Sequence, residues 1–182
     1  VRIGDLGSLS ASVDGTFDAV LLIANLIDIY DDGERRAVLE SLRELIAPDG
    51  LLIFSSHNLG SIGSQGPAAG GSPGPLALLR KLVDRPPVDA FRALARLPRR
   101  ARNRRRLAPL VYRATDHAIL NDEAHDYSLL HYYIGRDDQE RQLAELGYEL
   151  VESLDRDGRP AGPGDRAPAS ASLHYIARAA QG

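Results

Sequence analysis

The sequence predicts an α/β domain with a mostly parallel, doubly wound sheet. Two short apolar runs, at residues 20–23 and 51–54, do not alternate with polar residues, a pattern typical of strands buried on both faces. A helical pattern lies between them, over residues 31–46. Strand, helix and strand in this order form a βαβ unit, so we expect the two strands to run parallel with a right-handed crossover.

The helix between the two strands has recognisable ends and one apolar face. Asp31 or Asp32 can cap its first turn, and Pro48 follows its last turn. Apolar residues at three- and four-residue spacing mark the buried stripe: Val38, Leu39, Leu42, Leu45 and Ile46. A Pro-Asp-Gly turn then leads into the second strand.

The remaining chain continues as one domain over residues 1–182. Residues 59–106 predict a flexible Gly- and Pro-rich loop followed by a basic helical segment, with the helix over about residues 75–97. Residues 107–136 are rich in β-branched and aromatic residues and predict a β-rich insertion. Asp137 and Glu140 match a capping box at the start of a further helix. A strand near residues 148–154, a long loop and a final strand complete the domain.

Composition excludes several classes of protein. The chain has 182 residues, a net charge of −3 and no cysteine, so it has no disulfide and no thiolate metal site. No apolar run is long enough to span a membrane and no signal peptide is evident, so a cytoplasmic protein is expected. Lys81 is the only lysine among many arginines, which indicates a GC-rich bacterial genome.

The order of these elements resembles a class I S-adenosylmethionine-dependent methyltransferase. The best match is "FDAVLLIANLIDIYDDGERRAVLESLRELIAPDGLLIFSSHN", in which a strand opens with Phe-Asp and the next strand follows a Pro-Asp-Gly turn. "RDDQERQLAELGYELVES" and "LHYIARA" are similar to the last helix and strands of the family, and "AILNDEAHDYSLLHYYIGRDDQ" resembles an insertion in small bacterial members. The resemblance implies a Rossmann-like sheet whose last strand is antiparallel. It also implies S-adenosylmethionine as cofactor and a small-molecule or macromolecular acceptor of the methyl group at an O or N atom.

The chain departs from the family at its start. The Gly-rich loop of the family and the acidic residue that binds the cofactor ribose are not in this sequence, which opens with "VRIGDLGSL". That opening resembles the end of the third strand of the family. We therefore expect an N-terminally truncated domain, a fragment that lacks its first third; the alternative is a degenerate relative of the family.

The resemblance implies four cofactor contacts. Asp5 would accept a hydrogen bond from the adenine amino group, and the Leu6 backbone N–H would face the ring. Asn25 and Asp28 follow the first strand, near the methionine part of the cofactor. For Asp28 the alternative is a capping role at the start of the helix.

His57 and Asn58 lie at the carboxyl end of the second strand, where ligands bind in open α/β sheets. His57 can accept a proton from an attacking hydroxyl or amine, and Asn58 can contact the acceptor. The alternative for His57 is a hydrogen bond to a loop carbonyl.

The β-rich insertion carries further candidates for contact with the acceptor. His125, Tyr132 and Tyr133 are expected to line the acceptor site, with one tyrosine facing inward and the other solvent, because neighbouring strand residues alternate. Histidines and acids gather loosely here: His117, Asp122, His125, Asp126 and His131. No pair has the i, i+4 spacing of a helical zinc motif, so no metal is expected.

Residues 96–106 carry seven arginines. The favoured interpretation is a solvated helix face, because no aromatic residues are interleaved for base stacking. Two alternatives to the enzyme remain open at this point. One is a noncatalytic fragment that acts as an interaction module, and the other is an RNA-binding, methyltransferase-like protein that uses this run of arginines.

Overall fold

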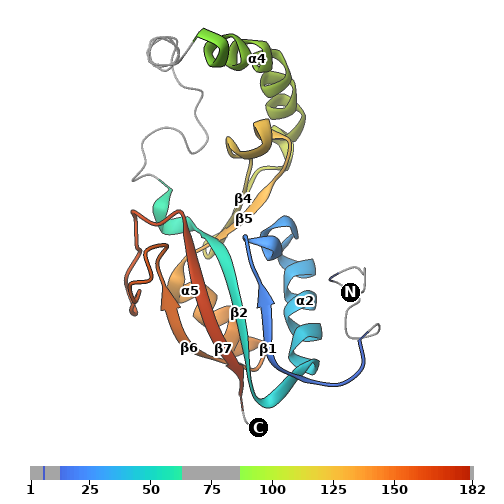
Figure 1. Ribbon diagram of the computed structural model, residues 1–182, viewed down its shortest axis with the longest axis vertical. Coiled ribbons are helices and arrows are strands. Elements are labelled where there is room, and N and C mark those ends of the chain that lie inside the picture. The colour runs from blue at the N-terminus through green and yellow to red at the C-terminus, as the bar shows by residue number, and fades with distance from the viewer. Residues whose placement is uncertain (1–5, 7–12, 63–86, 181–182) are drawn as a thin grey trace.

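The structure, a computed structural model, describes residues 6, 13–62 and 87–180 (Figure 1). The strands are β1 (Phe17–Leu22), β2 (Ile46–Asn58), β3 (Tyr112–Arg113), β4 (His117–Leu120), β5 (His131–Ile134), β6 (Tyr148–Leu154) and β7 (Ser172–Ala179). The helices are α2 (Asp32–Glu44), α4 (Pro87–Leu107) and α5 (Arg136–Glu145), with short 3-10 turns η2 (Leu26–Ile29), η3 (Leu59–Ser61), η4 (Ala108–Leu110) and η5 (Ala124–Tyr127). No helix in this described part of the chain is both long and apolar enough to cross a bilayer.

Strand β2 is the centre of the sheet. It pairs in parallel with β1 on one side and antiparallel with β7 on the other, and β6 pairs antiparallel with β7. The βαβ unit formed by β1, α2 and β2 and the antiparallel last strand are therefore confirmed. Residues 47–50 lie inside β2 as an irregularity in its register with β1, rather than before the strand. Gly50 is required there, because a Cβ would lie 2.7 Å from the carbonyl oxygen of Phe17.

The insertion strands extend the sheet beyond the end of β1. β3, β4 and β5 form an antiparallel ribbon within the range where a β-rich insertion is expected. β5 then pairs in parallel with the last two residues of β2, His57 opposite Tyr133 and Asn58 opposite Ile134. In Figure 1 this ribbon rises from the core sheet toward α4. The carboxyl end of β2 is therefore the junction between the core sheet and the insertion.

Only one face of the sheet is covered by helices among the described residues. The paired residues Leu22, Phe54 and Tyr175 share a face, and all belong to the buried core that includes Leu39 of α2 and Leu143 of α5. The next row, Leu21, Ile53 and Ile176, points to the opposite face, where Leu21 is 60% exposed. The prediction that β1 is buried on both faces is therefore wrong for the described part of the chain.

The helix ends differ partly from expectation. Asp31 caps α2 in a complete capping box with Glu34, as one of the two expected acids. The expected box at α5 is not formed: its N-cap is Gly135, and the Asp137 carboxylate instead accepts a hydrogen bond from the Gly164 N–H. The helix expected over residues 75–97 is observed from residue 87 to 107, and residues 75–86 lie outside the described part.

Candidate active site

The site begins with a histidine held by a buried carboxylate. Asp28, in η2, is completely buried, and its Oδ2 accepts hydrogen bonds from the His57 backbone N–H at 2.6 Å and from His57 Nδ1 at 2.7 Å. Because a carboxylate only accepts, Nδ1 of His57 carries the hydrogen. Nε2 of His57 is therefore the ring nitrogen with a lone pair available for chemistry.

Asp28 is itself held by two buried side chains, those of Arg35 and Ser56. Its Oδ1 accepts from Arg35 Nη1 at 2.6 Å and from the Ser56 hydroxyl at 2.7 Å. Arg35 is also fully buried, and its guanidinium stacks on the Tyr132 ring at 4.6 Å. Arg35 donates four hydrogen bonds and Asp28 accepts four, so this buried network sets the orientation of His57.

A second histidine–carboxylate pair faces the first from the insertion. His131 Nδ1 lies 3.0 Å from Asp122 Oδ2, and the Tyr133 hydroxyl donates to the same oxygen at 2.6 Å. The hydrogen bond to Asp122 raises the pKa of His131, the charges of Asp122 and Asp28 add to the rise, and burial opposes it. Burial, with the hydrogen bond to Asp122, raises the pKa of Tyr133, so the phenol keeps its proton and acts as a donor.

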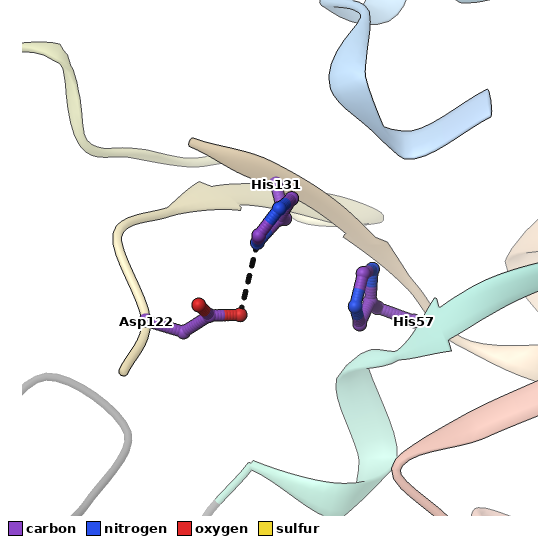
Figure 2. Close-up of side chains that lie close together, drawn as sticks. All are labelled: His57, Asp122 and His131. Carbon is purple, nitrogen blue, oxygen red and sulfur yellow. Dashed lines mark hydrogen bonds and ion pairs between the residues drawn. The ribbon is translucent and has the colours of Figure 1, made fainter. Parts of the chain in front are cut away.

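The two pairs meet face to face. The rings of His57 and His131 stack with centroids 5.0 Å apart, and Tyr133 lies 4.9 Å from His57. One ligand-type atom each of His57, Asp122 and His131 lies within 4.8 Å of the others. Figure 2 shows these three side chains grouped together. The site thus joins β2, β5 and the segment that follows β4.

A pocket of about 350 Å³ adjoins this site. Asp122 and Tyr133 belong both to the site and to the pocket wall. The other lining residues come from the position after η3, from α4 and from the insertion: Ile62, Arg104, Ala108, Val111, Arg113, Leu120 and Asn121. The wall is therefore mainly apolar, with two arginines and one carboxylate.

The turn after β1 has unusual backbone angles. Ala24 and Asn25 both have positive φ, 59° and 54°, which residues other than glycine seldom adopt. The Asn25 N–H donates to Ser55 Oγ at 2.8 Å and its Nδ2 donates to Ser172 Oγ at 2.9 Å. Such strain persists only where the surroundings fix it, and it is frequent at ligand sites.

Two residues that were expected to contact a ligand are instead buried in the protein. Asp28 has no exposed surface, so its carboxylate supports His57 instead of lying open to a ligand. Asn58 is also fully buried, and its Nδ2 donates to the carbonyls of Arg166, Ala167 and Ser170, which corrects its expected contact with an acceptor. Asp5 lies outside the described residues, and Leu6 packs against the core.

The two tyrosines of β5 alternate, but neither faces solvent. Tyr133 is 8% exposed and points to the site, whereas Tyr132 is 1% exposed and donates its hydroxyl hydrogen to Asp32 at 2.6 Å. The expected solvent-facing tyrosine is therefore wrong, because α2 and its buried Arg35 cover that side of β5. His125 is exposed, with its ring 6.2 Å from that of His131, at the rim of the site.

The sequence did not predict that Asp122, His131 and Arg35 belong to the same site as His57. Asp122 and His131 belong to the loose cluster noted above, but only the pairing of β5 with β2 brings them to His57. Arg35 lies three positions before Val38, on the face of the apolar stripe, and this position was the one available signal.

In the arginine run, Arg100 pairs with Glu123 and Arg104 lies over the Tyr127 ring, so part of the run anchors α4 to the insertion.

Comparison with other proteins identifies the architecture. No protein-family model matches the chain, and no curated protein sequence does. A solved methyltransferase from Clostridium acetobutylicum, described as S-adenosylmethionine-dependent, has 9% identity and a TM-score of 0.53 and matches 99% of this chain and 64% of its own length. The CcbJ methyltransferase from Streptomyces caelestis has 14% identity and a TM-score of 0.53, over 98% of this chain and 63% of its own.

The chain has the Rossmann-like fold of class I methyltransferases. The expected Rossmann-like fold, truncated at its start, and the resemblance drawn from the sequence are confirmed at this level. Within the described residues, only β1 with β2 and β2 with β5 pair in parallel. The chain spans just under two thirds of the length of these two solved methyltransferases.

Proposed function

We propose that this chain belongs to an enzyme that transfers a methyl group from S-adenosylmethionine to an oxygen or nitrogen atom of a small-molecule or macromolecular acceptor. The fold supports the class of reaction, and the Asp28–His57 pair carries the assignment of the site. When bound, the cofactor supplies an electrophilic methyl group whose carbon–sulfur bond breaks as the acceptor attacks.

His57 would remove the proton of the acceptor. Its Nε2 takes the proton from the hydroxyl or amine, while Asp28 holds Nδ1–H and stabilises the resulting imidazolium. Arg35 and Ser56 keep Asp28 in place during this step. Holding the acceptor in line with the methyl group supplies a further part of the rate.

The pocket beside the site is the proposed place of the acceptor. Its volume of about 350 Å³ is in the range of small-molecule sites. Arg104 and Arg113 in its wall favour an acceptor with a negatively charged group, and Tyr133 and the rim residue His125 would contact its reactive end.

The cofactor would lie at the turn after β1. The strained pair Ala24–Asn25 and the fixed amide of Asn25 fit a contact with the methionine part of S-adenosylmethionine. By the resemblance, Asp5 and Leu6 would contact adenine. The described residues thus fit part of the cofactor, and the Gly-rich loop of the family is not in this sequence.

The test uses the full product of the gene with isotopically labelled S-adenosylmethionine and a panel of hydroxyl and amine acceptors, some of them acidic. We expect label in a product, and we expect His57→Ala to lower the rate by about 100-fold or more, the contribution of a general base. His174→Ala is the matched control, because His174 is exposed on β7. Failure of the full gene product to bind S-adenosylhomocysteine in calorimetry, or an equal rate in His57→Ala, would overturn the proposal.

A further inference from the structure

The cluster of His57, Asp122 and His131 has a donor set that the proposed reaction does not use in full. We propose that these three side chains bind one divalent transition-metal ion of the zinc class. They offer two imidazole nitrogens and one carboxylate oxygen from β2, β5 and the segment after β4, all within 4.8 Å of one another (Figure 2). Two histidines and one carboxylate are a common ligand set for zinc with an open fourth position.

The supporting residues around the cluster are those that a metal site requires. A metal-binding histidine usually donates its other ring N–H to a carboxylate, and His57 donates Nδ1–H to Asp28. The ligating carboxylate is itself usually hydrogen-bonded, and Tyr133 donates to Asp122. Both supports are present in this structure, so Nδ1 of His57 is engaged by Asp28 and Nε2 is the nitrogen left for an ion.

The distances between the three side chains are compatible with binding of one ion. His131 Nδ1 and Asp122 Oδ2 are 3.0 Å apart, and the metal would replace the proton that they now share. Ligand atoms at zinc distances of about 2.0–2.1 Å in a tetrahedron lie roughly 3.3 Å apart. The wider separations would close by rotation of the partly exposed Asp122 side chain, because Asp28 holds His57 in place.

The metal would face the acceptor. Asp122 also lines the 350 Å³ pocket, so the open coordination position would point to the proposed acceptor site. With the metal bound, His57 would hold the ion instead of removing the proton, and the ion would lower the pKa of the acceptor group. This role would replace the base role proposed above, and His57→Ala would lower the rate in either case. The inference of a metal site stands on the cluster itself; only this role in activating the acceptor rests on the proposed function.

The experiment is a metal titration of the full gene product after treatment with a chelator and dialysis. Calorimetry with Zn²⁺ and the visible spectrum with Co²⁺ are expected to show one ion per chain. Asp122→Asn, which keeps the size and shape of the side chain, and His131→Ala are expected to weaken binding at least 100-fold. The matched controls His174→Ala and Asp126→Asn are expected to bind as the unchanged protein does.

The outcomes separate this site from the proposed function. Absence of one-to-one binding, or equal binding by Asp122→Asn, would overturn the metal site even if His131→Ala does not fold. Methyl transfer that persists fully after chelation, together with absence of metal binding, would remove the metal and leave the methyltransferase with His57 as base. Metal binding in a protein that does not bind S-adenosylhomocysteine would leave the metal site and remove the methyltransferase.

Discussion

At the end of β2, the polar side chain of Asn58 stabilises the fold instead of binding a ligand. Its Nδ2 donates to three carbonyls of the loop before β7, and its Oδ1 accepts from the Gly60 N–H at 2.8 Å. The loop packs closely here, because a Cβ on Gly60 would lie 2.2 Å from the Arg166 carbonyl oxygen. Asn58 therefore ties this loop to the strand that carries His57.

The substitution Asn58→Asp tests this role. It removes the amide donor and places a carboxylate beside three carbonyl oxygens, so we expect the free energy of unfolding to fall by about 3 kcal/mol or more. Urea denaturation followed by circular dichroism measures it. Asn103→Asp is the control, since Asn103 makes one such bond, to the Asp126 carbonyl, on α4. Equal losses in the two variants would contradict an anchoring role for Asn58.

At the scale of elements, Arg35 joins four parts of the chain. It extends from α2 to Asp28 of η2, to Ser56 of β2, and to Gln139 and Gln142 of α5. It has no exposed surface, although it is charged and lies on a helix. The helices and the end of β2 are thus held together by one cation and its partners.

Replacing Arg35 by Met is expected to destabilise the protein strongly. The loss leaves Asp28 buried without its cation, which costs about 3–5 kcal/mol. Denaturant unfolding measures the change, and adding Asp28→Asn should recover part of it, because the unpaired charge is removed. Arg36→Met is the matched control: this neighbour is partly exposed and its pairs with Asp32 and Glu145 are worth roughly 1 kcal/mol or less. A similar loss for both arginines would rule out the buried network as the source.

In these same elements, spacing in the sequence predicts the helix and the strands but not the contacts between them. The spacing of Val38, Leu39 and Leu42 predicted α2 and its buried face, and the apolar runs predicted two parallel strands. The same spacing places Arg35 on the buried face of α2, but it does not show what Arg35 contacts, because its partners lie in elements distant in sequence. For the same reason the approach of Asp122 and His131 to His57 was not predicted: it depends on how an insertion strand pairs with two residues of β2.

At the scale of the whole molecule, the two faces of the sheet differ. One face carries α2 and α5, and the opposite face presents the row Leu21, Ile53 and Ile176. Leu21 is 60% exposed and Ile23, two positions further, is 72% exposed. Among the described residues, β1 pairs only with β2, so its other edge also offers unpaired backbone groups. An apolar strand with an open edge is prone to association between copies.

We therefore expect this 182-residue chain to self-associate through β1. Sedimentation velocity should show an average sedimentation coefficient that rises with protein concentration, and the double variant Leu21→Lys, Ile23→Lys should reduce the rise, because two charges disfavour burial of this face and edge. Phe91→Lys is the control, since Phe91 is also 72% exposed but lies on α4, away from the core sheet. Association that persists in the double variant, or that Phe91→Lys alone reduces, would place the contact elsewhere than β1.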